Sequence, residues 1–405
     1  MKFRWFLLIG LLLAILACQT IMPQVPQATP PGSQAQPPPI QTETPAPEAA
    51  SPGMPTVRGF AAVVGHTIEF REKAGQKYAE IQGPESAFWE ANRLHIAGPM
   101  PAGNQTVPLL YFVFDNGEAL IYRDPNGQAF TLSQGEAFMG LTGVPARPVI
   151  AFSQLEYLPT NLRSKIYAGT AQTISSAAPL LTIDDPESWA IKVILLEAVQ
   201  DVPTRVWYTR IAYGIGGDIV FEPRKSLWYL DVASGQTFQV LENEAAPWDI
   251  SPDHSLVAYS NTGSGQPGGM ALRNLQSGAS VTYAMRPASE PRGAGNAFFS
   301  PDGRYLAWME GDGWMMADVP SFHATVRVGD LNGNVLAEFS DTDIGNALPG
   351  RKAAWVQPVG WLDAQTLLVQ TRGQNWEEAA IVKIDLPSRG ISYLAPGVFV
   401  GLVYP

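Results

Sequence analysis

The sequence predicts an all-β fold, a β-propeller of seven four-stranded blades closed into a ring. The prediction rests on two sequence motifs, called phrases below, that alternate along the chain. The first is a hairpin, FFSPDGRYLAW at 298–308 and DISPDHSLVAY at 249–259. The second is a strand, a polar residue, a glycine turn and another strand, as in LWYLDVASGQTFQVL at 227–241. A β-sandwich is the alternative, but it does not explain why both phrases share one spacing.

The first 18 residues, MKFRWFLLIGLLLAILAC, have the layout of a secretory signal. Lys2 and Arg4 precede an apolar run that ends at Ala17 and is shorter than the ~20 residues a membrane-spanning helix needs. The stretch Ile-Leu-Ala-Cys ending at Cys18 resembles the lipobox of bacterial lipoproteins. That resemblance implies a signal peptide over 1–17 and a lipid on Cys18, which would anchor the chain to a bacterial membrane. An ordinary signal peptide or an uncleaved anchor is the alternative.

Residues 18–57 are expected to form a disordered tether between the lipid and the folded domain. Eleven of the 35 prolines lie in 19–57, among Gln, Thr, Ala and Ser, and no hydrophobic period is present. Such a segment cannot bury enough apolar surface to offset its ordering entropy. Cys18 is the only cysteine, so the propeller expected over 58–405 contains no disulfide.

The first phrase begins each predicted unit. In SPDG, Ser at the first position, Pro at the second and Gly at the fourth favour a type I turn between two strands. Copies of this phrase are placed at about 86–98, 247–260, 297–309 and 359–371, the first of them by a loose alignment of WEANRLHIA with WLDAQTLLV.

The second phrase follows the first in each unit and sets the number of units. Its copies lie at 68–81, 120–132, 227–241, 271–283, 326–339 and 381–394, with turn glycines at Gly75, Gly127, Gly235, Gly278, Gly333 and Gly390. One gap is twice the others, which places a degenerate copy near 165–175. The stride of about 52 residues fits seven four-stranded units, with six or eight as the neighbouring alternatives.

The SPDG hairpin followed by the aspartate–glycine hairpin resembles the WD-repeat-like propeller of TolB-type periplasmic proteins. It also resembles the propeller that caps prolyl oligopeptidases. The resemblance is strong over about 205–395 and weak over 58–200. It implies a domain that binds proteins or shapes access to a site elsewhere, and it does not imply a particular ligand.

The two chain ends are expected to close the ring together. The first unit, from Gly59 to Ile81, holds three strands and lacks an inner one, whereas GVFVGLVYP at 397–405 is a spare apolar strand after the last unit. We therefore expect 397–405 to become the innermost strand of the first blade, which removes an exposed sheet edge.

The binding face is expected where the second-to-third connections and the blade-to-blade connections meet, because these are the long segments. They are placed at 98–107, 214–225, 261–269, 309–325, 340–356 and 371–379. The apolar candidates there are anchors for a partner or, alternatively, covers of the channel mouth: Trp314, Met315, Met316 and Trp376. The arginine candidates hold an anionic or carboxylate ligand or, alternatively, form rim salt bridges: Arg224, Arg286, Arg292, Arg351 and Arg372.

Catalysis, metal and cofactor have little support in the sequence. The four histidines form no ligand-spaced pair, and no GxSxG motif provides a nucleophile. His254 takes the glycine position of an SPDG turn. With 26 basic and 37 acidic residues the net charge is −11, which argues against nucleic acid as a partner.

Three functional hypotheses follow. The first is a non-catalytic, monomeric, lipid-anchored module on the extracytoplasmic side of a bacterial membrane (the cell surface or the periplasmic face) that binds an envelope protein or an extracellular ligand. The second is a propeller that binds a glycan or peptide through aromatic and arginine contacts. The third is a hydrolase with an acidic channel site.

Overall fold

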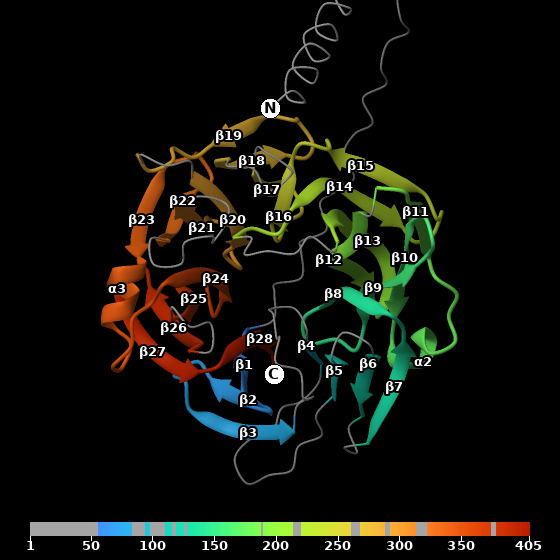
Figure 1. Ribbon diagram of the computed structural model, residues 1–405, viewed down its shortest axis with the longest axis horizontal. Coiled ribbons are helices and arrows are strands. Elements are labelled where there is room, and N and C mark those ends of the chain that lie inside the picture. The colour runs from blue at the N-terminus through green and yellow to red at the C-terminus, as the bar shows by residue number, and fades with distance from the viewer. Residues whose placement is uncertain are drawn as a thin grey trace, which may run out of the picture. The chain divides into compact units, whose positions relative to one another are not determined.

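The computed structural model describes residues 56–82, 94–97, 110–115, 119–124, 128–187, 189–213, 220–260, 268–287, 292–312, 322–373 and 378–405. These residues form seven antiparallel four-stranded sheets, which stand around a centre like blades (Figure 1). The prediction of a seven-bladed β-propeller is therefore confirmed.

Three blades come from the first half of the chain, each given from its innermost to its outermost strand. Blade 1 consists of β28 (Val398–Val403), β1 (Gly59–Val64), β2 (Thr67–Glu72) and β3 (Lys77–Gln82). Blade 2 consists of β4 (Leu94–Ala97), β5 (Leu110–Asp115), β6 (Ala119–Arg123) and β7 (Ala129–Gln134). Blade 3 consists of β8 (Ala137–Gly143), β9 (Ile150–Tyr157), β10 (Leu162–Gly169) and β11 (Leu181–Asp185), with the short helix α2 (Ala171–Ile174) between its last two strands.

Four blades come from the second half. Blade 4 consists of β12 (Trp189–Val199), β13 (Val202–Ala212), β14 (Arg224–Asp231) and β15 (Thr237–Leu241). Blade 5 consists of β16 (Ala246–Ile250), β17 (Leu256–Ser260), β18 (Met270–Asn274) and β19 (Ser280–Thr282). Blade 6 consists of β20 (Arg292–Phe299), β21 (Tyr305–Asp312), β22 (Ala324–Asp330) and β23 (Val335–Ser340), and α3 (Asp341–Asn346) follows it. Blade 7 consists of β24 (Trp355–Trp361), β25 (Thr366–Arg372), β26 (Ala380–Asp385) and β27 (Gly390–Pro396).

The two SPDG-type turns have the same hydrogen bonds. In 300–303 the amide of Gly303 donates to Ser300 O at 2.8 Å, and in 251–254 the amide of His254 donates to Ser251 O at 2.8 Å. Each first serine also donates from Oγ to the aspartate of its turn, at 2.6 Å in both. His254 has φ +57° and Gly303 has φ +67°, so the histidine does occupy the glycine position. Local residue chemistry therefore sets these turns.

The ring closes as the sequence predicts. β28, the last strand of the chain, pairs antiparallel with β1 and supplies the innermost strand of blade 1. Gln370 of β25 also holds it, since Oε1 of Gln370 accepts a hydrogen bond from the amide of Phe399 at 2.7 Å. Nε2 of the same side chain donates to Ala380 O at 2.9 Å and to Gly397 O at 3.2 Å. Blade 7 thus fixes the start of the closing strand.

Three details of the repeat assignment were wrong or shifted. The copy at 86–98 is wrong, because 94–97 is the innermost strand of blade 2 and not the second strand of a hairpin. The segment 98–107 therefore lies between a first and a second strand, which puts its flanking ends on the opposite face. At 386–390 the residue with positive φ is Arg389, at +55°, in place of Gly390. The degenerate copy near 165–175 is confirmed as the connection from β10 to β11.

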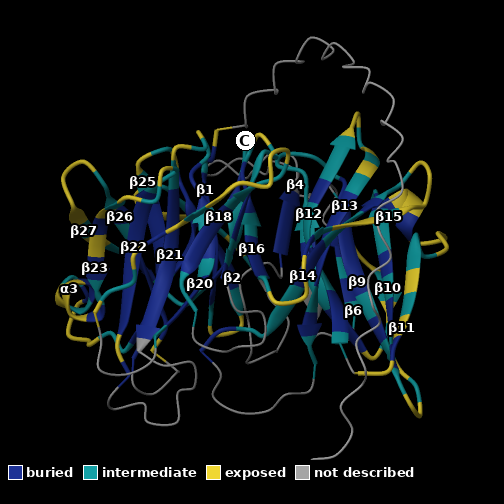
Figure 2. Cartoon of the chain, turned by 90° about the horizontal axis from the view of Figure 1, so that it is seen from above, coloured by how far each residue is buried: buried dark blue, intermediate teal, exposed yellow. Residues whose placement is uncertain are grey.

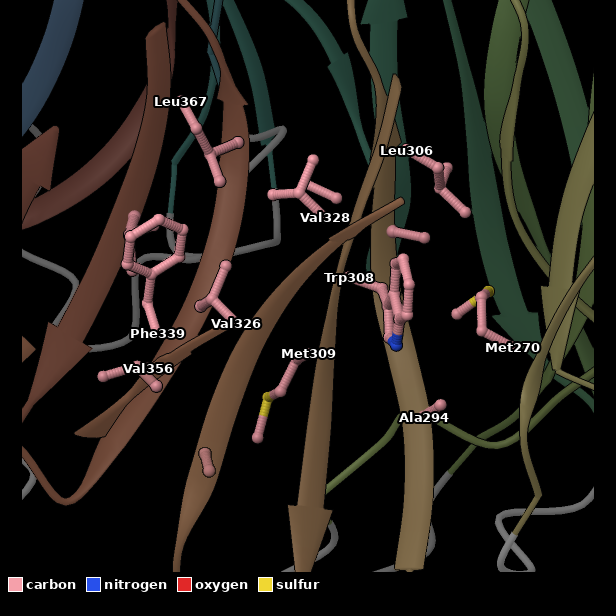
Figure 3. Packing of buried hydrophobic residues seen from close by; sticks show 14 of the residues in the cluster. Met270, Ala294, Leu306, Trp308, Met309, Val326, Val328, Phe339, Val356 and Leu367 are labelled. Carbon is pink, nitrogen blue, oxygen red and sulfur yellow. The ribbon is translucent and has the colours of Figure 1, made fainter. Parts of the chain in front are cut away.

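The core lies between the blades, where sheet faces stack on their neighbours. The largest cluster joins blades 5, 6 and 7 and includes Trp308, Met309 and Val326, all at most 1% exposed (Figure 3). Viewed from the side, the strands are mostly buried, and exposed residues gather in turns and outer strands (Figure 2). This packing holds the strand ends, and therefore the residues of both faces, in fixed positions.

Candidate binding face

One face of the propeller gathers the second-to-third connections and the blade-to-blade connections, because successive strands of each blade alternate in direction. In blades 4 to 7 the second-to-third connections span 213–223, 261–269, 313–323 and 373–379. The first-to-second connections of the same blades are short, for example 200–201 and 300–304. We call the face that holds the second-to-third and blade-to-blade connections the connection face. Trp314, Met315, Met316 and Trp376 belong to its connections but lie outside the described residues.

Arg224, the first residue of β14, lies on this face in a compact cluster. Its Nε donates to Glu222 Oε2 at 2.8 Å, and its Nη1 donates to Pro247 O at 3.0 Å. The guanidinium carbon lies 4.3 Å from the ring centroid of Trp248. Lys192 of β12 donates to both oxygens of Glu222, at 2.8 and 3.0 Å. Five residues from three strands and one connection therefore meet here.

The electrostatics of this cluster keep Glu222 ionised. Burial alone would raise the pKa of Glu222, but the charges and hydrogen bonds of Lys192 and Arg224 outweigh it and lower that pKa to about 2. A carboxylate held in this state does not deliver protons at neutral pH. It serves as an acceptor for two cations.

A second cluster lies at the same face in blade 6 and includes Arg286 and Arg292. Glu310 of β21 is 1% exposed. Its Oε2 accepts from Nη1 of Arg327 at 2.6 Å, its Oε1 accepts from the amide of Arg286 at 2.9 Å, and Nη1 of Arg292 lies 3.6 Å from Oε1. Arg327 also donates to Glu338 at 2.7 Å, and the side chain of Arg286 donates to the hydroxyl of Thr325. These arginines are thus engaged in intramolecular contacts.

The other two arginine candidates do not join these clusters. Arg351 is exposed in the connection that follows α3. Arg372 ends β25, and its carbonyl accepts from the amide of Ala354 at 2.9 Å. The sequence therefore placed all five arginines in or beside segments of one face, and among the described contacts Arg286 and Arg292 meet at Glu310.

Sequence reasoning missed Lys192, Glu222, Glu310 and Arg327. A signal was present for three of them, because Lys192, Glu310 and Arg327 interrupt apolar strands, WAIKVILL, LAWMEGD and ATVRVGD. A charge on a buried strand requires a partner. No comparable signal marks Glu222, which is 30 residues from Lys192 in the chain and meets it only through the fold.

A buried histidine joins blades 2 and 3. His95 of β4 is 9% exposed, its Nε2 lies 2.9 Å from Arg147 O, and its ring fills the space beside Gly143 of β8. Burial lowers the pKa of His95 to about 4, although the hydrogen bond to Arg147 O acts in the opposite direction. The imidazole is therefore neutral in the folded protein at physiological pH.

We expect His95 to make folding stability depend on pH between about 6.5 and 4. The unfolded chain protonates this residue near pH 6.5 and the folded chain only near 4, so stability is full above that window and falls as the pH decreases. The loss at pH 4 should be about 3 kcal/mol. Urea unfolding at several pH values measures it. His95→Gln should lack this part of the dependence, and an unchanged dependence would contradict the assignment.

Asp249 of β16, an innermost strand, is a further group whose pKa is shifted. Its Oδ2 accepts from the amide of Phe299 at 2.7 Å and its Oδ1 accepts from the amide of Ile250 at 2.9 Å. Burial raises the pKa of Asp249 to about 7, against the effect of these amides and of Arg224. Its carboxyl links the inner strands of blades 5 and 6.

The described residues hold no side-chain group suited to a metal ion and no helix suited to crossing a membrane. Within the described ranges, no three or more His, Cys, Asp or Glu side chains lie close enough together to hold a metal ion. None of the helices in the described part of the chain has the length and apolar character to cross a membrane.

The comparisons with known proteins support the propeller at the level of fold. No protein-family model matches the chain. No curated protein is similar to it in sequence. A solved prolyl endopeptidase is similar over 85% of this chain and 50% of its own, with a TM-score of 0.50 and 10% identity.

Two other solved structures are similar at lower TM-scores. TolB from Acinetobacter baumannii gives 0.40 with 11% identity, over 85% of this chain and 81% of its own. An oligogalacturonate lyase in complex with manganese gives 0.47 with 15% identity, over 72% of this chain and 74% of its own. Identities this low say nothing about activity.

Proposed function

We propose that this chain is a non-catalytic, lipid-anchored, extracytoplasmic module that binds a protein of the cell envelope through its connection face. One observation carries the proposal. The long second-to-third connections of four consecutive blades, 4 to 7, all emerge on that face, whereas the opposite face of these blades has short turns. Binding residues are more common on long connections than on tight turns, because a tight turn is constrained by the strands that it joins.

The ion pairs of the carboxylates on this face support a role in binding rather than in catalysis. Glu222 is held ionised between Lys192 and Arg224, and Glu310 is held by Arg327 and Arg292. A general acid or base needs a pKa near the operating pH and a free proton path. The pKa of Glu222, about 2, lies far from neutral pH, and both oxygens of Glu310 already accept hydrogen bonds, from Arg327 and from the amide of Arg286. The clusters therefore support a rigid binding surface.

Site-specific photo-crosslinking in cells tests the proposal. A photoreactive residue at Glu244 or Lys352, both exposed in blade-to-blade connections, should capture a defined envelope protein. The matched controls are Ser234 and Ser277, which are exposed in turns of the opposite face. Capture from the control positions alone, or from none of the four, would contradict the proposed face.

The lipid anchor is part of the proposal and has its own test. Cys18→Ser removes the thiol that would take the lipid, and several acyl chains are needed for stable membrane binding. We expect the variant to lose incorporation of labelled palmitate and to move from the membrane to the soluble fraction. Retention of the variant in the membrane, without label in either protein, would instead indicate an uncleaved N-terminal anchor.

A further inference from the structure

Two cations share one carboxylate at the start of blade 4. Lys192 and Arg224 both contact Glu222, within 3.0 Å. The side chains of Lys192 and Arg224 are 15% and 11% exposed, and that of Glu222 is 28% exposed. The group therefore carries one positive charge more than its carboxylate neutralises.

The neighbouring cations show that this excess of positive charge is specific to Lys192 and Arg224. Arg210 has its own carboxylate in Asp185, and Lys225 has its own in Glu187, at 3.3 Å. Asp249 offsets the excess only in part, because burial raises its pKa to about 7 and its two oxygens point to the amides of Ile250 and Phe299 and form no ion pair with Arg224 in the described residues. Among the cations at this end of blade 4, only Lys192 and Arg224 divide a single acid between them in the described residues.

Arg224 keeps donors available for a further acceptor. Its Nε and Nη1 are used by Glu222 and Pro247 O, and within the described residues no group accepts from Nη2. Arginine has five N–H donors in a planar fork, a geometry that suits a carboxylate. The fork is also fixed in place, because it lies 4.3 Å from the centroid of the Trp248 ring.

The cluster is rigid and lies beside the centre of the ring. The aliphatic part of Lys192 passes so close to Gly140 of β8 that a Cβ there would lie 2.8 Å from it. Phe221 and Trp248 pack with similar closeness against Gly295 of β20. Inner strands of blades 3, 5 and 6 thus hold the cations in place, so a ligand meets them preorganised.

We propose that Lys192 and Arg224 bind a carboxylate from an acidic segment of the partner protein; this rests on the proposed function and names the chemistry of its ligand. A positive charge without a counter-charge is costly in free energy where water has limited access. A bound carboxylate supplies the missing counter-charge. Glu222 then contacts both cations and competes with the arriving carboxylate for them.

Fluorescence anisotropy with a labelled hexaglutamate peptide tests the proposal on residues 51–405. We expect binding that weakens with salt and that is absent for hexaglutamine. Lys192→Gln leaves Arg224 and Glu222 as a balanced pair and should weaken binding at least tenfold. Lys225→Gln removes the same charge from a balanced pair nearby and should change it less than twofold. Glu222→Gln removes the competing carboxylate and should strengthen binding severalfold, which a merely structural role does not predict.

Equal weakening by Lys192→Gln and Lys225→Gln would show a general electrostatic effect and overturn the proposal. Absence of hexaglutamate binding, or binding of a uronic-acid oligosaccharide in its place, would overturn it as well. Circular dichroism confirms that each variant is folded. If photo-crosslinking from the connection face succeeds while hexaglutamate fails, the proposed function stands and only the ligand chemistry is wrong.

Discussion

Removal of residues 397–405 is expected to abolish the cooperative unfolding of the whole propeller. These residues contain β28, and Phe399, Val400 and Val403 are at most 3% exposed in its sheet. Burying a side chain of this size contributes about 1.5–3 kcal/mol. Three of them contribute about as much as the 5–15 kcal/mol by which a typical domain is stable.

The loss should extend beyond blade 1 because β28 contacts two neighbouring blades. Gln370 of blade 7 would lose its acceptor and donor partners at Gly397 and Phe399, and a buried group left without partners costs about 1–3 kcal/mol. Without its inner strand, blade 1 also exposes the edge of β1. Calorimetry of the truncated chain measures the effect. Deletion of Pro405 alone, which is exposed, is the control. An unchanged transition in the 397–405 deletion would refute the account of closure.

The variant Glu310→Ala is expected to destabilise the propeller by about 3–5 kcal/mol, the usual cost of removing one partner from a buried ion pair. Arg327 is 4% exposed and would lose its 2.6 Å contact with Oε2, while the side chain of Arg292 lies 3.6 Å from Oε1. The buried guanidinium of Arg327 would then lack its main counter-charge. Urea unfolding at neutral pH measures the change.

Glu338→Ala is the matched control for this variant. Glu338 contacts the same Arg327 at 2.7 Å, but its side chain is 42% exposed, so water can replace it. Exposed ion pairs contribute about 0–1 kcal/mol. Similar losses in the two variants would mean that burial does not set the strength of this network.

The fold could be predicted because its signals are local. In 300–303 and 251–254 the turn residues bond to one another, so the sequence of four residues is enough to specify the turn. Repetition of such turns at one spacing then gives the number of blades. Where the local signal is weak the prediction failed, as at 94–97, a strand of four residues without a turn phrase beside it.

The candidate site was only partly predictable because its contacts are not local. The prediction selected Arg224 by its place in a connection. Glu222 is two residues away, but the other cation on this acid, Lys192, comes from the inner strand of the same blade, and Trp248 comes from the next blade. The charge of Lys192 within the apolar stretch WAIKVILL indicates that it needs a partner, but the sequence does not indicate which acid this is.

The sequence by itself determined the seven-bladed ring, its closure by the last strand, and the side on which the long connections of blades 4 to 7 lie. Turn chemistry and strand periodicity act between residues close in the chain, so they can be read without coordinates. Only the tertiary structure decided which charges share partners: Lys192 with Arg224 on one carboxylate, and Arg327 with Arg292 on Glu310. The physical reason is that stacking of sheets brings distant strands together, and burial then requires each charge to find a partner there.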